Sequence, residues 1–250
     1  ITQRDSLLSI PFEELMDGPA YTNVLMLRNI KDMQDNWDEL KKFLKSYDFG
    51  LLEVNAIKKL REFLPNPIDS LLVLPPTSVL CMDPEARSLR DGIIMDFNLL
   101  YKNPNGMVGL LAHEMFHTYC SALVDHDFLY TNSVVAALEL LLNEGLTDQV
   151  DKDNPYTLLE GIGIPDVIKE KYIYAYENTP QILQELDSLA VSYIDGNMEQ
   201  KEFWRKAYNH IAFEGHPNGY YMTSMIKRQG LLDELKVNFA NPVDFARIYN

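Results

Sequence analysis

The segment His113-Glu114-Met115-Phe116-His117 constrains this chain more than any other stretch of its sequence. The apolar residues 107–112 lead into it, and such a run is typical of a buried helix. Residues four apart share a helix face, so both imidazoles can bind one Zn²⁺ ion. Glu114, beside the first histidine, can then reach a water molecule on that ion. We therefore expect Zn²⁺ as the cofactor, His113 and His117 as ligands, and Glu114 as a general base.

Chance is the alternative explanation for so short a motif. With 5 histidines in 250 residues, the pattern His-Glu-x-x-His arises by chance in roughly one such chain in a hundred. Most single histidines on apolar helices are core or surface residues rather than metal ligands. A catalytic zinc site also needs a third protein ligand, so a second motif is required.

That second motif is the segment 143–148, Asn-Glu-Gly-Leu-Thr-Asp, on the next predicted helix. Glu144 lies 27 residues after His117. A carboxylate from a neighbouring helix is the third ligand of two-His-one-Glu zinc sites, which keep the fourth position for water. Asp148 follows Glu144 by one helical turn on the same face. It is predicted to accept a hydrogen bond from the outer nitrogen of a ligand histidine, His113.

The two motifs together resemble those of the gluzincin metallopeptidases, whose best-known member is thermolysin. The resemblance is strong over residues 113–148 and implies a zincin-like fold with the metal on both histidines and Glu144. An edge strand binds the substrate backbone in this family, and residues 93–99 are expected to fill that role. The 27-residue gap and the short chain differ from thermolysin-like and aminopeptidase members. These differences favour a small bacterial branch of the family, and no substrate can be inferred from the resemblance.

Residues 215–221, Gly-His-Pro-Asn-Gly-Tyr-Tyr, form a third candidate segment. In thermolysin-like enzymes a downstream His and a Tyr donate hydrogen bonds to the tetrahedral intermediate. The resemblance implies this catalytic role for His216 with Tyr220 or Tyr221. Each such donor contributes roughly 2.7–4 kcal/mol to transition-state stabilisation. The alternative is a helix N-terminus followed by a pair of packing tyrosines.

Other candidate ligands are weaker. The metzincin pattern needs Gly at position 120 and His at position 123, where this chain has Cys120 and Leu123. His126, between two aspartates, is an alternative third ligand, although a solvated loop is favoured for it. Cys120 is expected to be a buried structural thiol. His210 is expected to be a surface or core residue.

Apolar periodicity and turn residues predict a predominantly helical α+β fold. A small sheet, with an edge strand on the metal-site helix, is followed by a helical C-terminal lobe. Residues 1–66 are expected to be a helical segment packed on a catalytic core of residues 67–250, or part of one single domain. Strands are predicted over 70–74, 78–82 and 92–99, and helices over 32–47, 51–64, 107–123, 132–150, 165–177, 180–194, 198–213, 219–227 and 242–248.

Composition limits the partners and the compartment. A net charge of −15 argues against nucleic acid or an anionic membrane as a partner. No apolar run approaches the 18 residues of a membrane-spanning helix. Because the first residue is Ile1, we expect removal of an N-terminal segment and export to the periplasm, medium or cell surface, with the cytoplasm as the alternative. Cys81 and Cys120 form either one bridge or, as we favour, two buried thiols.

The expected function is that of a zinc-dependent peptidase acting on a peptide or protein substrate. Endopeptidase or oligopeptidase activity is preferred over aminopeptidase activity, because the chain lacks a Gly-x-Met-Glu-Asn motif. The alternatives are a non-catalytic zinc-binding domain that binds a partner or peptide, and a helical domain with a coincidental motif. Glu114 favours the enzyme, since zinc binding alone needs only the ligands. No oligomeric state follows from the sequence.

Overall fold

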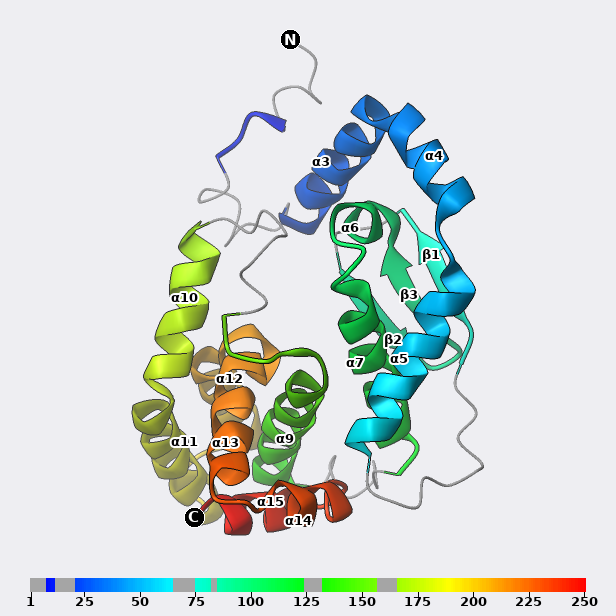
Figure 1. The fold of residues 1–250 in the computed structure, drawn as a ribbon. Helices are drawn as coiled ribbons and strands as arrows, with labels where there is room; N and C mark the ends of the chain where they lie inside the picture. The colour runs from blue at the N-terminus through cyan, green and yellow to red at the C-terminus, as the bar shows by residue number, and fades with distance from the viewer. Residues whose placement is uncertain (1–7, 12–20, 65–74, 82–84, 124–131, 157–165) are drawn as a thin grey trace.

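A computed structural model describes residues 8–11, 21–64, 75–81, 85–123, 132–156 and 166–250 of the chain (Figure 1). The fold is predominantly helical, with one small sheet. In the described ranges, the strands are β1 Thr77–Leu80, β2 Ala86–Leu89 and β3 Gly92–Asp96, and the longer helices are α3 Tyr21–Asp35, α4 Trp37–Ser46, α5 Phe49–Phe63, α6 Phe97–Lys102, α7 Met107–Ser121, α9 Ser133–Asp151, α10 Asp166–Glu177, α11 Thr179–Ile194, α12 Gln200–His210, α13 His216–Arg228, α14 Leu232–Val237 and α15 Pro242–Tyr249.

The sheet has the order β1-β3-β2, with β1 parallel and β2 antiparallel to the central strand β3. The prediction that residues 93–99 form an edge strand is therefore wrong. The edge strand beside α7 is β2, where the Ser88 and Thr118 hydroxyl oxygens lie 2.9 Å apart. The sequence did not predict β2, because its four residues, Ala-Arg-Ser-Leu, lack a continuous apolar run.

The predicted strand over 92–99 also ends early, at Asp96, for a local reason. The Asp96 side chain caps α6 by accepting a hydrogen bond from the backbone N–H of Leu99 at 2.8 Å. Its second oxygen accepts from the Asn29 side chain at 2.7 Å, which ties α3 to the end of the central strand. Asn98 extends this buried network by donating to Asn29 and Asp32. One capping residue thus turns an apolar strand pattern into a strand and a helix.

The predicted helix over 32–47 is two helices, α3 and α4, which meet at Asn36. The Asn36 side chain donates to the backbone oxygen of Asp32 at 2.8 Å, and its backbone leaves the helical region with φ −109° and ψ 20°. An asparagine that binds its own helix in this way competes with helix continuation. α5 lies against α7, so the N-terminal helices reach the motif helix (Figure 1). The division at residue 66 stays a prediction.

The C-terminal lobe packs around α9, which contacts α12, α13 and α15 (Figure 1). α12 ends at His210 rather than at residue 213, and α13 begins at His216 rather than at Gly219. Left-handed backbone at Phe213, Glu214 and Gly215 interrupts the helix here, with φ values of 49°, 55° and 102°. The helix α14 was not predicted.

Several remaining expectations concern single features. Cys81 is exposed and Cys120 is buried, and both are free, so the bridge is excluded and the expectation of a buried thiol is correct for Cys120 alone. The predicted strand over 70–74 and the candidate ligand His126 lie outside the described residues. Across the described ranges, no helix combines the length and the apolar character needed to cross a bilayer.

Candidate metal centre

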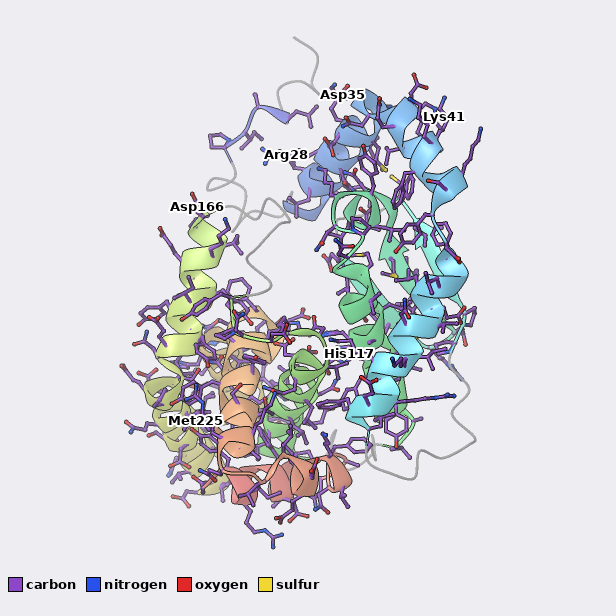
Figure 2. The ribbon with its side chains drawn as sticks, viewed as in Figure 1. Arg28, Asp35, Lys41, His117, Asp166 and Met225 are labelled. Carbon is purple, nitrogen blue, oxygen red and sulfur yellow. The ribbon has the colours of Figure 1, made fainter. Side chains whose placement is uncertain are left out.

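The two motif histidines lie on the face of α7 that turns toward α9, and His117 is labelled in Figure 2. Their Nε2 atoms are 3.1 Å apart. The outer nitrogens have separate oxygen partners, because His113 Nδ1 lies 3.3 Å from Asp151 Oδ1 and His117 Nδ1 lies 3.3 Å from Asn143 Oδ1. Glu114 is buried beside them.

These contacts orient the two imidazoles. A carboxylate or amide oxygen only accepts hydrogen bonds, so the Nδ1 atoms of His113 and His117 are the protonated ones. Their Nε2 atoms then face each other at 3.1 Å, and His117 Nε2 also faces the Glu144 carboxylate at 3.4 Å, so a proton or a cation must lie among these atoms. The motif is thus arranged to bind a cation through two Nε2 atoms.

Glu144 brings a carboxylate oxygen to the same place from α9. Its Oε2 atom is buried and lies 3.4 Å from His117 Nε2. Ligand atoms bound about 2.1 Å from a tetrahedral Zn²⁺ ion are separated by about 3.4 Å. The two separations around His117, 3.1 and 3.4 Å, are close to this value. Donor chemistry and spacing both fit zinc.

Electrostatic interactions between the side chains of the centre couple Glu144 to His117. Burial would lower the pKa of His117, but the hydrogen bond and charge of Glu144 outweigh burial and raise this pKa to about 9. Burial would raise the pKa of Glu144, but the charges of His216, His117 and His113 lower it to about 2. A proton therefore occupies the centre at neutral pH, and a metal ion must displace it.

His216 enters the centre from the first turn of α13. Its Nε2 lies 3.2 Å from Glu144 Oε2, and its Nδ1 lies 3.0 Å from Asp148 Oδ1. Its ring stacks on that of His113, with centroids 5.6 Å apart. His113, Glu144 and His216 each place a ligand atom within 4.8 Å of the others. His216 is thus close enough to bind a metal ion or to contact a group bound at it.

A close contact between two glycines sets the position of α13. A Cβ atom on Gly145 would lie 2.4 Å from the backbone oxygen of Gly219, and one on Gly219 would lie 2.1 Å from the oxygen of Leu141. Neither distance is sterically allowed, so only glycine permits α9 and α13 to pack this closely. Gly145 follows Glu144 directly, and Gly219 lies three residues after His216. The contact therefore brings His216 to Glu144.

Asp148 is fully buried behind the histidines, but the hydrogen-bond contact of His113 Nδ1 is with Asp151, so the role expected for Asp148 stays a prediction. Its Oδ1 atom lies 3.7 Å from His113 Nδ1 and 3.0 Å from His216 Nδ1, so it faces two imidazoles rather than one. The ammonium group of Lys152 contacts the same oxygen. Burial would raise the pKa of Asp148, but the charges of Lys152 and His216 keep it well below its usual value. Sequence reasoning missed Lys152, because a lysine at a helix end is usually solvated.

The two candidate tyrosines have other partners in this structure. The Tyr220 hydroxyl donates to the backbone oxygen of Lys152 at 3.3 Å, and burial raises the pKa of Tyr220 to about 12. The ring of Tyr221 packs edge-on against Tyr176, with centroids 5.5 Å apart. The catalytic role expected for one of them stays a prediction. His210 pairs with Glu185 at 2.9 Å, as a surface residue would.

Comparison with known proteins gives one match. Residues 1–250 match the family model described as "Putative zinc dependent peptidase (DUF5700)". A search of curated proteins and a search of solved structures find no match. The family match covers the whole chain, and its description agrees with the zinc-binding chemistry of the centre.

Proposed function

The chain belongs to this zinc-dependent peptidase family, and we propose that it hydrolyses peptide bonds at the centre formed by α7, α9 and α13. One observation carries the proposal. The Nε2 atoms of His113 and His117 lie 3.1 Å apart, and the buried Glu144 Oε2 lies 3.4 Å from that of His117. In this proposal His113, His117 and Glu144 hold zinc as in gluzincins. Zinc bound there supplies a Lewis acid that polarises a carbonyl and lowers the pKa of water to about 7.

Glu114 is the proposed general base. It is buried on α7 next to the ligand His113, in a site where zinc binding alone would not need a further carboxylate. Its carboxylate takes a proton from the attacking water as the water oxygen bonds to the carbonyl carbon. The same proton then passes to the amide nitrogen as the C–N bond breaks. The reaction therefore consumes one water molecule and regenerates the Glu114 carboxylate.

His216 is the proposed donor to the oxyanion. Its Nδ1 donates to Asp148, which leaves Nε2 directed toward Glu144 at the edge of the ligand cluster. A protonated imidazole in this place donates both hydrogen bonds at once, one to Asp148 and one to the substrate oxygen. Losing such a donor costs roughly 10²–10³ in kcat.

The edge of β2 that faces away from β3, unpaired within the described ranges, is the proposed binding site for the substrate backbone. Asp96 donates its backbone N–H to the Glu85 oxygen, so the antiparallel register turns the backbone groups of Glu85, Arg87 and Leu89 toward β3. Those of Ala86 and Ser88 then face away from the sheet. An extended peptide can pair there and continue in both directions, which favours an endopeptidase or oligopeptidase.

Replacing the general base tests this function directly. Glu114→Gln should bind zinc as the wild type does and lose peptide hydrolysis, because an amide cannot accept the proton from water. Hydrolysis of a mixture of quenched fluorescent peptides and zinc content should be measured on the same samples. Glu53→Gln, an exposed change on α5, is the matched control and should keep both properties. Full hydrolysis by Glu114→Gln would refute the mechanism.

One observation favours a second candidate, a non-catalytic zinc-binding domain. His216 Nε2 lies as close to Glu144 Oε2, at 3.2 Å, as His117 Nε2 does at 3.4 Å. As a neutral ligand, His216 would give the metal four protein ligands, which is the closed arrangement of structural sites. The substitution His216→Ala separates the two functions. An oxyanion donor predicts a large loss of kcat at unchanged zinc affinity, whereas a fourth ligand predicts weaker zinc binding and no hydrolysis in the wild type.

A further inference from the structure

We propose that Lys152 is a positioning residue of the metal centre. Its buried ammonium group holds the Asp148 carboxylate, and Asp148 in turn orients the imidazoles of His113 and His216. The inference rests on the zinc site of the proposed function, but it does not require that peptide bonds are cleaved. It assigns a role to a lysine that neither motif includes.

Burial of the pair is the first step in this argument. The side chain of Lys152 is 3% exposed and that of Asp148 is fully buried, and the ammonium contacts Asp148 Oδ1. Removing an ammonium group from water costs several kcal/mol, so it is kept inside a protein only with a close partner. Lys152 follows the last residue of α9 and has an extended backbone. Its backbone N–H donates to the backbone carbonyl oxygen of Asp148 at 3.0 Å. The Tyr220 hydroxyl donates a hydrogen bond to the backbone carbonyl oxygen of Lys152.

Convergence on one oxygen is the second step. Asp148 Oδ1 faces Lys152 from α9, His216 Nδ1 from α13 at 3.0 Å and His113 Nδ1 from α7 at 3.7 Å. Asp148 Oδ2 has no hydrogen-bond partner among the described residues, so the contacts of Oδ1 set the orientation of the carboxylate. His216 Nδ1 bonds this oxygen directly, whereas His113 Nδ1 bonds Asp151 and faces Asp148 Oδ1 as a longer ion-pair contact, and in both rings Nε2 then points away from Asp148. Lys152 therefore acts on the metal ligands through the carboxylate.

Charge is the third step. His113, Asp148 and Asp151 place ligand atoms within 4.8 Å of one another and resemble a second cation site. The Lys152 ammonium already contacts one of these carboxylates, and the charge of the other also raises the lysine pKa, although burial alone would lower it. The ammonium group of Lys152 thus supplies the positive charge that a metal ion would supply to the cluster of His113, Asp148 and Asp151. Its charge balances those of Asp148 and Asp151, and it does not occupy the proposed zinc site on the Nε2 side of the histidines.

A double-mutant cycle tests the role of Lys152. Zinc affinity is measured by competition with a chromophoric chelator for the wild type, Lys152→Met, Asp148→Asn and the double variant. Removing an outer partner of a ligand histidine typically weakens metal binding 10–100-fold, and we expect this for both single variants. Since Lys152 acts through Asp148, the double variant should bind zinc no more weakly than Asp148→Asn. The visible absorption of bound Co²⁺ reports whether the ligand geometry changes in parallel.

Lys227→Met is the matched control, because Lys227 also contacts α9, through Gln149 at 3.3 Å, but not Asp148. It should leave zinc affinity and the Co²⁺ spectrum unchanged. A zinc affinity of Lys152→Met within about threefold of the wild type would overturn the inference, as would additive losses in the double variant. If Lys152→Met does not fold, Asp148→Asn and the double variant still give the comparison. Wild-type protein that binds zinc but cleaves no peptide would refute the peptidase and leave this inference intact.

Discussion

Gly145→Ala perturbs the contact that joins the two halves of the metal centre. The added Cβ atom would lie 2.4 Å from the backbone oxygen of Gly219, about 1 Å inside ordinary van der Waals contact at about 3.4 Å. A backbone oxygen cannot rotate away as a flexible side chain can. α9 and α13 must therefore move apart by about that distance, and Glu144 and His216 must separate with them.

The size of the effect follows from two opposing terms. Alanine gains about 0.5–1 kcal/mol over glycine inside a helix. Overpacking costs about 1–3 kcal/mol in an ordinary core and more where backbone meets backbone. We expect a net loss of about 1–2 kcal/mol in the free energy of unfolding. For a chain of this length that corresponds to a Tm lower by roughly 2–8 °C. Because His216 shifts by about 1 Å, kcat should also fall, by an amount on the order of 10²-fold.

Urea denaturation and peptide hydrolysis, each measured with saturating zinc, check both effects. Gly50→Ala is the matched control, since an added Cβ atom in α5 would meet only a side-chain oxygen at 3.4 Å. That variant should be as stable as the wild type or more stable. If Gly145→Ala were equally stable and fully active, the glycine contact would not position His216, and the reasoning would fail.

Two further predictions concern pH and the sheet edge. In metal-free protein the pKa of His117, raised from 6.5 to about 9, gives stability that is full below pH 6.5 and lost as the pH rises through 9. The pKa of Glu144, lowered from 4.5 to about 2, gives stability present above pH 4.5 and lost as the pH falls through 2. Urea titrations in chelator should therefore show this contribution at its maximum between pH 4.5 and 6.5, and Glu144→Gln should abolish it. Ala86→Pro removes an N–H on the edge of β2 that faces away from β3, so KM should rise while the Tm stays nearly constant. Arg87→Pro removes an N–H directed at β3 and should lower the Tm instead; equal Tm losses would contradict the assigned edge.

The sequence was sufficient for the parts of the centre that depend on local periodicity. His113 and His117 share a face of α7 because they are four residues apart, and Glu144 and Asp148 share a face of α9 for the same reason. Both helices were predicted to within about two residues. The burial of both helices in the core also follows from their high content of apolar residues. The spatial pairing of the two motifs came from the resemblance to gluzincins rather than from periodicity.

Features that depend on contacts between distant segments were not predictable in this way. Strand order is one example, because a short apolar run does not show whether its strand is central or at an edge. The position of His216 is another, since it depends on a glycine contact between α9 and α13. Lys152 has no sequence signal beyond its position four residues after Asp148, a spacing shared by many solvated pairs. Asp96 did offer a local signal, because it is a capping residue that precedes an apolar helical turn. The apolar strand pattern of the same segment was the stronger signal and hid it.

Zinc content of the purified chain, measured by elemental mass spectrometry, tests the central claim most directly. The wild type and Glu114→Gln should each hold about one zinc ion per chain, and Glu144→Ala should hold none, because two histidines alone do not retain the metal. Glu53→Ala, an exposed change on α5, should match the wild type. A wild type without zinc after reconstitution, or a Glu144→Ala variant that retains it, would contradict the proposed two-His-one-Glu centre.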